Sequence, residues 1–269
     1  MPTVRTNFQP RSQISHVIFD FDGTLSWLRH GWPGIMCEVF LKYIPLHPGE
    51  SRQALAQSLL EEILSLNGKP SIFQMQLCLR HAEERGSHKP DIEKLLLEYH
   101  RRLESTIQER TKEILEGKAS RDEFIVYCAR QLVEKLRERG LVLIILSGTA
   151  EPQVKQEAEL LELTRHFGRH IYGGTSDLAQ SSKRAVIERL LREENISGEH
   201  LLAFGDGPVE IALTKAVGGL AVGVASDEER NGSGQMHPVK RNQLSEAGAD
   251  ILIPDYREPD TLLEGLLGK

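Results

Sequence analysis

Carboxylate residues directly follow two apolar runs of this sequence. Asp20 and Asp22 come after HVIF, and Asp206 comes after LLAFG. Two carboxylates one residue apart repel each other unless a cation compensates their charge, and a divalent metal ion is the natural partner. Mg²⁺ prefers oxygen ligands, so Asp20 and Asp206 with a backbone carbonyl group would suit it. The pattern therefore predicts a Mg²⁺ site built at the ends of strands.

Further polar residues follow the same rule. Ser-Gly-Thr at 147–149 comes after the run LVLIIL, Lys183 begins a helical pattern, and Glu210 lies shortly after Asp206. In a parallel sheet the carboxyl ends of the strands share one edge, where ligands bind. Residues that are far apart in the sequence are therefore expected to meet at that edge.

The elements that must position these residues alternate along the chain. Strands are predicted at 17–19, 141–146, 170–174, 201–204, 220–225 and 250–254, with helices near 123–139, 151–165, 182–194, 208–216 and 238–247. Alternating strands and helices require crossover connections and a mostly parallel sheet covered on both faces. We expect an α/β fold with a Rossmann-like, doubly wound parallel sheet.

A Leu-rich, charged block interrupts this pattern. Between about 27 and 118, apolar residues recur at spacings of three and four, which is typical of amphipathic helices. With 269 residues, the chain is long enough for a substantial domain and a smaller one. We expect a loose tail at 1–14, a core formed by 15–26 and 119–269, and a smaller helical domain at 27–118.

Four short segments together resemble the motifs of the haloacid dehalogenase superfamily, in the same order. They are DFDGT at 20–24, LSGT at 146–149, Lys183, and GDGPVE at 205–210. The helical block between the first two resembles the type 1 cap of the phosphatase branch, in which phosphoglycolate phosphatase and β-phosphoglucomutase belong. The resemblance implies a Mg²⁺-dependent phosphohydrolase with a helical cap.

The resemblance also implies roles for the acidic residues. Asp20 would attack phosphorus and become transiently phosphorylated. Asp22 would protonate the leaving group and then activate water, while its backbone carbonyl joins Asp20 and Asp206 around the metal. Glu210 stands where the family commonly has Asp. This substitution keeps the charge, so Glu210 is expected either to support the metal or to orient Lys183.

The remaining motif residues are expected to hold the phosphoryl group. Thr24, Ser147 and Gly148 would bind its oxygens, and Lys183 would neutralise charge during transfer. The Ser-Gly-Thr segment can also be interpreted as a helix N-cap before Glu151, since capping and phosphate binding can coexist.

Substrate choice is expected to come from the helical block. A mobile helical cap encloses a small molecule and excludes water, which favours a small phosphorylated metabolite over a phosphoprotein. Arg29 and His30 lie near the expected hinge, and Lys69 and Gln74 lie in or beside a loop. These four are candidate substrate contacts, although each can equally be a solvated side chain.

Hydrolysis of a small phosphomonoester, such as a sugar phosphate or a phosphoglycolate-like metabolite, is the function that these observations favour. A phosphoglucomutase-like mutase is the nearest alternative, because it uses the same two aspartates. A non-catalytic metabolite-binding protein is the alternative from another class. The dehalogenase and phosphonate-cleaving branches are disfavoured, because Asp22 is present.

Composition limits the remaining possibilities. The net charge of −6 argues against affinity for nucleic acid, which requires a surplus of Lys and Arg. The three cysteines are widely spaced, so neither a zinc cluster nor a disulfide framework is predicted. The sequence shows neither a signal peptide nor a stretch apolar enough to cross a membrane. We expect a cytoplasmic protein, and the sequence does not indicate an oligomeric state.

Overall fold

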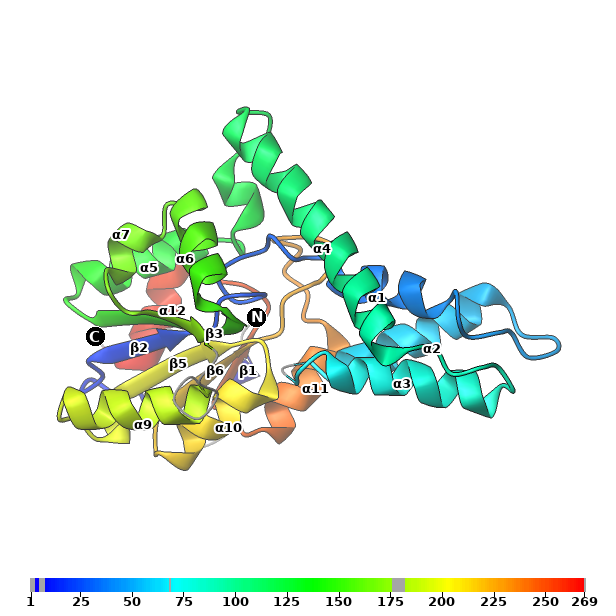
Figure 1. The fold of residues 1–269 in the computed structure, drawn as a ribbon. Helices are drawn as coiled ribbons and strands as arrows, with labels where there is room; N and C mark the ends of the chain where they lie inside the picture. The colour runs from blue at the N-terminus through cyan, green and yellow to red at the C-terminus, as the bar shows by residue number, and fades with distance from the viewer. Residues whose placement is uncertain (1–2, 5–7, 68, 176–181, 269) are drawn as a thin grey trace. The chain divides into compact units, whose positions relative to one another are not determined.

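The chain divides into two compact units in the computed structural model, which describes residues 3–4, 8–67, 69–175 and 182–268. Met1–Leu28 and Gly117–Lys269 form the first, here called the sheet unit, and Arg29–Glu116 form the second, the helical unit (Figure 1). The helical block of the sequence thus has packing of its own, and it enters the chain between two segments of the sheet unit.

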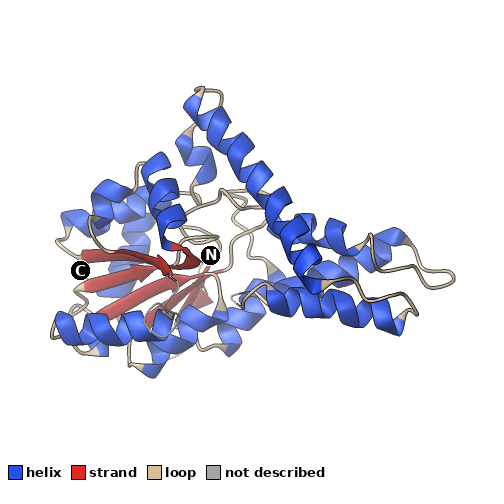
Figure 2. Cartoon of the chain, viewed as in Figure 1, coloured by secondary structure: helices blue, strands red, loops and turns tan. Residues whose placement is uncertain are grey.

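The sheet unit contains a seven-stranded sheet of order β1-β7-β6-β5-β2-β3-β4. Six strands are parallel, and β1 pairs antiparallel with β7 at one edge (Figure 2). The confirmed architecture is therefore the expected Rossmann-like α/β fold. The strands are β1 Thr3–Val4, β2 His16–Phe19, β3 Val142–Ala150, β4 Ile171–Gly174, β5 Leu201–Gly205, β6 Leu220–Val224 and β7 Ile251–Ile253.

Helices cover both faces of this sheet, so its strands are near-continuous apolar runs rather than alternating ones. Helices α9 and α10 lie on one face, and α5, α6 and α7 lie on the other (Figure 1). Within the described ranges, the helices of this unit are η1 Arg121–Phe124, α5 Ala129–Glu138, α6 Glu151–Leu160, α7 Thr164–Phe167, α9 Lys183–Glu193, η2 Gly198–His200, α10 Pro208–Ala216, α11 Pro238–Glu246 and α12 Pro259–Leu267.

Strand β2, which Asp20 follows directly, lies in the interior of the sheet. It lies between β3 and β5, with Phe19 in register with Ile145 on one side and with Phe204 on the other. The rings of Phe19 and Phe204 stack with centroids 4.9 Å apart, and Phe167 meets Phe19 edge to face. This packing fixes the strand end from which the first motif emerges.

The helical unit forms a hydrophobic core of its own from four helices. They are α1 Trp32–Phe40, α2 Arg52–Ser65, α3 Ile72–Glu84 and α4 Ile92–Leu115. Ser51 caps α2 by accepting a hydrogen bond from the backbone of Ala54, and Asp91 caps α4 in the same way. Buried residues of all four helices meet in one cluster, including Phe40, Leu59, Met75 and Leu95.

The secondary structure of the sheet unit differs from the sequence-based expectations at several places. Thr3–Val4 were expected in a loose tail, but they pair with β7. The outer edge of β7 offers unpaired backbone groups, and Thr and Val are both β-branched residues that favour strands. The expected helix at 123–139 is broken, because Ile125 and Val126 pair with the segment around Ser26 and Cys128 takes a positive φ of 62°. Helix α12 was not predicted.

None of the helices in the described ranges combines the length and apolar character that crossing a membrane requires.

Candidate active site

The first motif leaves β2 in a tight turn. Asp20 follows the strand directly, is 7% exposed, and its backbone N–H donates to Phe204 O at 2.9 Å. Gly23 has a φ of +74°, which a residue with a Cβ rarely adopts. A Cβ at Gly23 would also collide with the carboxylate of Asp206. Glycine is therefore required here both for the turn and for the close approach of the two motifs.

The neighbouring strand β3 brings the Ser-Gly-Thr segment to the same edge. Ser147 is buried, and its Oγ accepts a hydrogen bond from Thr149 N at 3.1 Å. The hydroxyl of Thr149 donates to Oδ2 of Asp22 at 2.8 Å. Thr149 thus orients Asp22, the second aspartate of the first motif. Gly148, which lies between Ser147 and Thr149 in the chain, is exposed.

Helix α9 presents Lys183 from its first turn, after Ser182 caps the helix by accepting from Ala185 N at 3.2 Å. The ammonium group of Lys183 donates to Oδ1 of Asp20 at 2.7 Å and also contacts Glu210. Glu210 is 5% exposed and lies in the first turn of α10. Of the two roles expected for Glu210, contact with Lys183 is the one visible in the side-chain geometry.

A second lysine, which sequence reasoning missed, contacts the other motif aspartate. Lys240 in α11 is fully buried, and its Nζ lies 2.8 Å from Oδ2 of Asp206. It also contacts Glu228 and donates to Ser226 Oγ at 3.2 Å. The sequence around Lys240, PVKRNQLSE, is typical of a surface helix, so nothing in it signals this position.

The electrostatic environment raises the pKa of Asp20 to about 6 from its ordinary value of 3.8. Burial is the largest cause, and the negative charges of Asp206 and Asp22 act in the same direction. The ammonium group of Lys183 opposes them and lowers the pKa. Burial therefore outweighs the attraction of Lys183 and favours the protonated form of Asp20.

A divalent cation fits this charge distribution. Asp22 and the four carboxylates that contact an ammonium group outnumber the two ammonium groups, which leaves a formal charge of −3 when all seven are ionised: Asp20, Asp22, Asp206, Glu210 and Glu228 with Lys183 and Lys240. One oxygen of Glu210, Oε2, is buried without a hydrogen-bond partner. Hard oxygen donors of this kind suit Mg²⁺.

The protein side chains alone do not complete such a site. Across the described ranges, no three His, Cys, Asp or Glu side chains are grouped as ligands around one point. A cation held by Asp20 and Asp206 would therefore need a backbone carbonyl group and substrate or water oxygens as well. Mg²⁺ commonly keeps such ligands, so the donor set agrees with its preference.

Thr24 is placed differently from the other phosphate-binding candidates. Its side chain is fully buried, and Oγ1 has no hydrogen-bond partner. Ser147 and Gly148 lie at the end of the neighbouring strand, and Lys183 contacts Asp20 directly. Thr24 and Ser147 are thus both buried, although the hydroxyl of Ser147 has a hydrogen-bond partner, and Gly148 and Lys183 are at least partly exposed.

The four candidate substrate contacts all belong to the helical unit. The backbone carbonyl and ring Nε2 of His30 are held by the guanidinium group of Arg110, at 3.1 and 3.0 Å. Lys69 is exposed, with its Nζ 6.0 Å from the ring centroid of Phe73. Arg29 is partly exposed. These three side chains retain at least partial access to solvent or ligand.

Gln74 does not fit the expectation of a substrate contact. It is only 3% exposed, and its amide nitrogen donates to Leu66 O at 3.2 Å. On α3 it is followed by Met75, which belongs to the core cluster of the helical unit. Gln74 therefore packs inside this unit, because the helix begins early enough to turn position 74 inward.

A doubly wound sheet with carboxylates and lysines gathered beyond the carboxyl ends of its central strands places the chain among α/β enzymes with a Rossmann-like architecture. A family model for haloacid dehalogenase-like hydrolases matches residues 14–218. The chain belongs to this family and is an enzyme of the hydrolase type. No curated protein matches the sequence.

Solved structures of the same fold resemble the whole chain at low identity. A predicted phosphoglycolate phosphatase from Haemophilus somnus is 15% identical, covers 93% of this chain and 98% of its own, and has a TM-score of 0.62. A haloacid dehalogenase family hydrolase from Deinococcus radiodurans, with bound phosphate and sodium, is 17% identical over 94% and 96%, with a TM-score of 0.61. CbbY from Rhodobacter sphaeroides, in complex with xylulose-1,5-bisphosphate, is 17% identical over 91% and 96%, with a TM-score of 0.55.

Proposed function

We propose that the protein is a phosphatase that hydrolyses a small phosphomonoester through an aspartyl-phosphate intermediate on Asp20. The observation that carries the proposal is the contact between Asp20 and Lys183, in a site where Thr149 also orients Asp22. A buried carboxylate beside an ammonium group can act as a nucleophile while the transferred phosphoryl charge is neutralised. The similar structures that contain phosphate or a sugar bisphosphate support this choice of substrate class.

The reaction would take place in two steps. In the first, Asp20 attacks phosphorus, the bond to the leaving oxygen breaks, and the carboxyl group of Asp22 gives that oxygen a proton. In the second, Asp22 takes a proton from water, which attacks phosphorus and releases inorganic phosphate from Asp20. Asp22 thus ends each cycle protonated, and Asp20 ends it as a carboxylate.

Lys183 and the backbone around Ser147 and Gly148 would hold the phosphoryl oxygens during both steps. A Mg²⁺ ion, held by Asp20, Asp206 and the backbone carbonyl of Asp22, would supply further positive charge to the phosphoryl group when bound. Lys183 contacts both Asp20 and Glu210, and Glu210 would thereby hold the ammonium group in place beside Asp20.

Residues 27–118 would act as the cap that selects the substrate, with Arg29, His30 and Lys69 as its candidate contacts. The helical unit has its own hydrophobic core and contains none of the four motifs. We propose that selectivity therefore resides in the helical unit, while the sheet unit performs the chemistry. The substrate would be a small phosphorylated metabolite, selected by the helical unit and hydrolysed by residues of the sheet unit.

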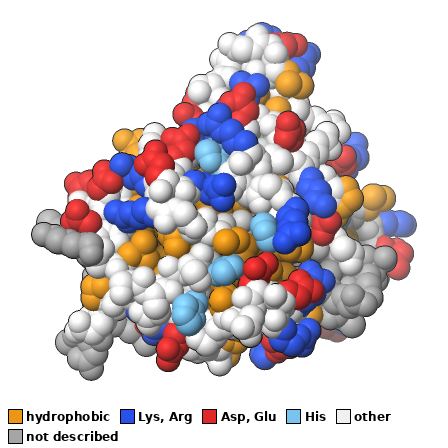
Figure 3. Space-filling view, turned by 90° about the vertical axis from the view of Figure 1, so that its left-hand side faces the viewer, with side chains coloured by type: hydrophobic (Ala, Val, Ile, Leu, Met, Phe, Trp, Pro, Cys, Tyr) orange, Lys and Arg blue, Asp and Glu red, His pale blue; other side chains and the backbone are white. Residues whose placement is uncertain are grey.

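One face of the molecule offers little support for a polyanionic substrate. On the face shown in Figure 3, acidic and basic side chains are interspersed rather than separated by sign. Together with the net charge of −6, this distribution is unlike the basic stripe that nucleic acid binding requires. A small phosphomonoester needs only the local positive charge of Lys183 and a bound cation.

The direct test is an assay with an aryl phosphate, with added Mg²⁺ and with excess chelator. We expect hydrolysis with Mg²⁺ and none with chelator, and Ca²⁺ should replace Mg²⁺ poorly because its larger shell misplaces the carboxylate. A panel of phosphorylated metabolites then identifies the substrate by release of inorganic phosphate. An isomerised sugar phosphate without phosphate release would instead show a mutase, and full activity in chelator would overturn the metal dependence.

A further inference from the structure

Lys240 lies at a junction of three segments of the sheet unit. Its Nζ contacts Asp206 after β5 and Glu228 after β6, and it donates to Ser226 Oγ. Ser226 in turn donates its hydroxyl hydrogen to Gly23 O at 3.1 Å, in the turn after β2. One buried ammonium group thus reaches both motif loops that carry the aspartates, directly at Asp206 and through Ser226 at Gly23.

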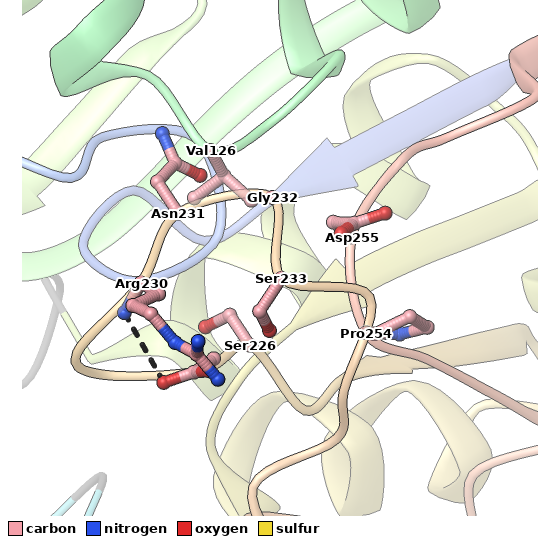
Figure 4. A pocket seen from close by; sticks show the side chains of 9 residues that line it. Val126, Ser226, Arg230, Asn231, Gly232, Ser233, Pro254 and Asp255 are labelled. Atoms are coloured by element: carbon pink, nitrogen blue, oxygen red, sulfur yellow. Dashed lines mark hydrogen bonds between the residues drawn. The ribbon is translucent and has the colours of Figure 1, made fainter.

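The loop after β6 is shaped to deliver Glu228 to this lysine. Oδ1 of Asp227 accepts from the backbone of Glu229 at 2.9 Å and of Arg230 at 3.2 Å, which fixes a tight turn around position 228. Figure 4 shows the bond to Arg230, with Ser226 and Ser233 lying beside it on the same loop. Asn231 then anchors the loop by accepting from Tyr127 N at 2.9 Å.

Such an arrangement is costly unless the charges compensate each other. A buried ammonium group loses its hydration, and only closely placed carboxylates offset that loss. Here the Nζ of Lys240 contacts two carboxylates, Asp206 at 2.8 Å and Glu228, and these offset the loss of hydration. Lys240 therefore carries a fixed positive charge beside the carboxylate that is the candidate metal ligand.

We propose that Lys240 is a positioning residue that acts as a resident cation: it fixes Asp206 through Oδ2 and weakens the binding of a divalent cation at that carboxylate. The inference rests on the proposed function, because it concerns the affinity of the same site for Mg²⁺. An ammonium group and a divalent cation on one carboxylate repel each other strongly in a buried environment. Glu228 moderates this repulsion, because it contacts the same ammonium group.

Two substitutions with opposite effects on local charge test this inference. Lys240→Met removes the resident charge, and Mg²⁺ should then bind at least about tenfold more tightly, since the charge effect exceeds the loss of side-chain order at Asp206. Glu228→Gln removes the moderating charge but keeps an acceptor for Lys240, and Mg²⁺ should bind several-fold more weakly. Isothermal titration calorimetry with Mg²⁺ alone measures both constants without turnover.

Lys215→Met is the matched control. Lys215 forms an ion pair with Asp250 at 2.8 Å, but it lies in the last turn of α10, at the opposite end from Glu210. Its replacement should leave the Mg²⁺ affinity unchanged. If Lys240→Met does not fold, Lys240→Gln removes the same charge while retaining hydrogen bonding, and tighter Mg²⁺ binding is expected for it too.

The measured Mg²⁺ affinities test the role of Lys240 separately from the proposed function. Tighter binding by the Lys240 variant and weaker binding by the Glu228 variant support the resident cation. Unchanged or weaker binding in the folded Lys240 variant would show that this lysine has only a structural role, and would overturn the inference while leaving the proposed function intact. A parent protein that binds no divalent cation would overturn both.

Discussion

The ammonium group of Lys183 lies 2.7 Å from Oδ1 of Asp20, although 163 positions separate the two residues in the chain. The central place of β2 brings this pair together, because Asp20 leaves that strand beside the ends of β3 and β5. Lys183 comes from the first turn of α9, which packs on one face of the same sheet. The contact joins a nucleophile candidate with the group that would neutralise phosphoryl charge.

Removing this lysine should affect turnover far more than folding. Lys183→Met is expected to lower kcat for an aryl phosphate by about 100-fold or more, the usual loss when a charge-stabilising group is removed. Lys155→Met is the control, since Lys155 forms an exposed pair with Glu151. Steady-state kinetics on both variants measures the difference, and a Lys183 variant that keeps parental kcat would exclude a role in charge stabilisation.

Asp20→Asn should abolish activity yet stabilise the metal-free protein at neutral pH. The pKa of Asp20 is raised from 3.8 to about 6 on folding, so its contribution to stability is full below pH 3.8 and is lost as pH rises through 6. Asparagine carries no such loss, so the variant should be more stable by up to about 3 kcal/mol near pH 7.5.

Denaturant unfolding in chelator, carried out at several pH values, checks this expectation. The stability difference between Asp20→Asn and the parent should shrink towards zero as the pH falls below 3.8, where the parental carboxyl group becomes protonated in both the folded and the unfolded state. A difference that does not change with pH would mean that Asp20 is not the titrating group.

The hydrogen bond from Thr149 to Asp22 should matter most when the leaving group needs a proton. Thr149→Val removes this bond, and we expect kcat to fall about 3- to 10-fold for an alkyl phosphate, in line with the loss of one hydrogen bond. An aryl phosphate with a good leaving group should be affected less. Thr106→Val is the control, because the Thr106 hydroxyl donates only within α4. Equal losses on both substrates would argue against Asp22 as the general acid.

Substitutions in the helical unit should separate selectivity from stability. Lys69→Ala is expected to lower kcat/KM for the preferred metabolite about tenfold, the loss of one substrate contact, while the aryl phosphate reaction changes little. Gln74→Ala should instead lower the free energy of unfolding, because Gln74 is buried and donates to Leu66 O. If Lys69→Ala changes neither substrate, Arg29 and His30 become the better candidates for selecting the substrate.

Most strands of the sheet unit could be predicted, because short runs of neighbouring residues in the sequence mark them. Apolar runs ending in Asp20, Ser147 and Asp206 mark buried parallel strands, and their shared edge follows from the fold class alone. Lys240 could not be predicted, because a lysine in a polar helix is usually solvated and its burial depends on the shape of the 226–233 loop. Periodicity likewise missed the break at Ile125–Cys128, because pairing with the segment near Ser26 overrides local helix preference.

The most direct test of the proposed mechanism is detection of the phosphorylated intermediate on Asp20. Asp22→Asn should slow its hydrolysis, so protein quenched in acid during turnover of an aryl phosphate with Mg²⁺ should carry a phosphoryl group. Mass spectrometry of the digested protein is expected to locate the phosphoryl group at Asp20. No adduct should form in the double variant that carries both Asp20→Asn and Asp22→Asn. Steady turnover by the parent with no adduct at Asp20 in either protein, or turnover retained by Asp20→Asn, would contradict the mechanism.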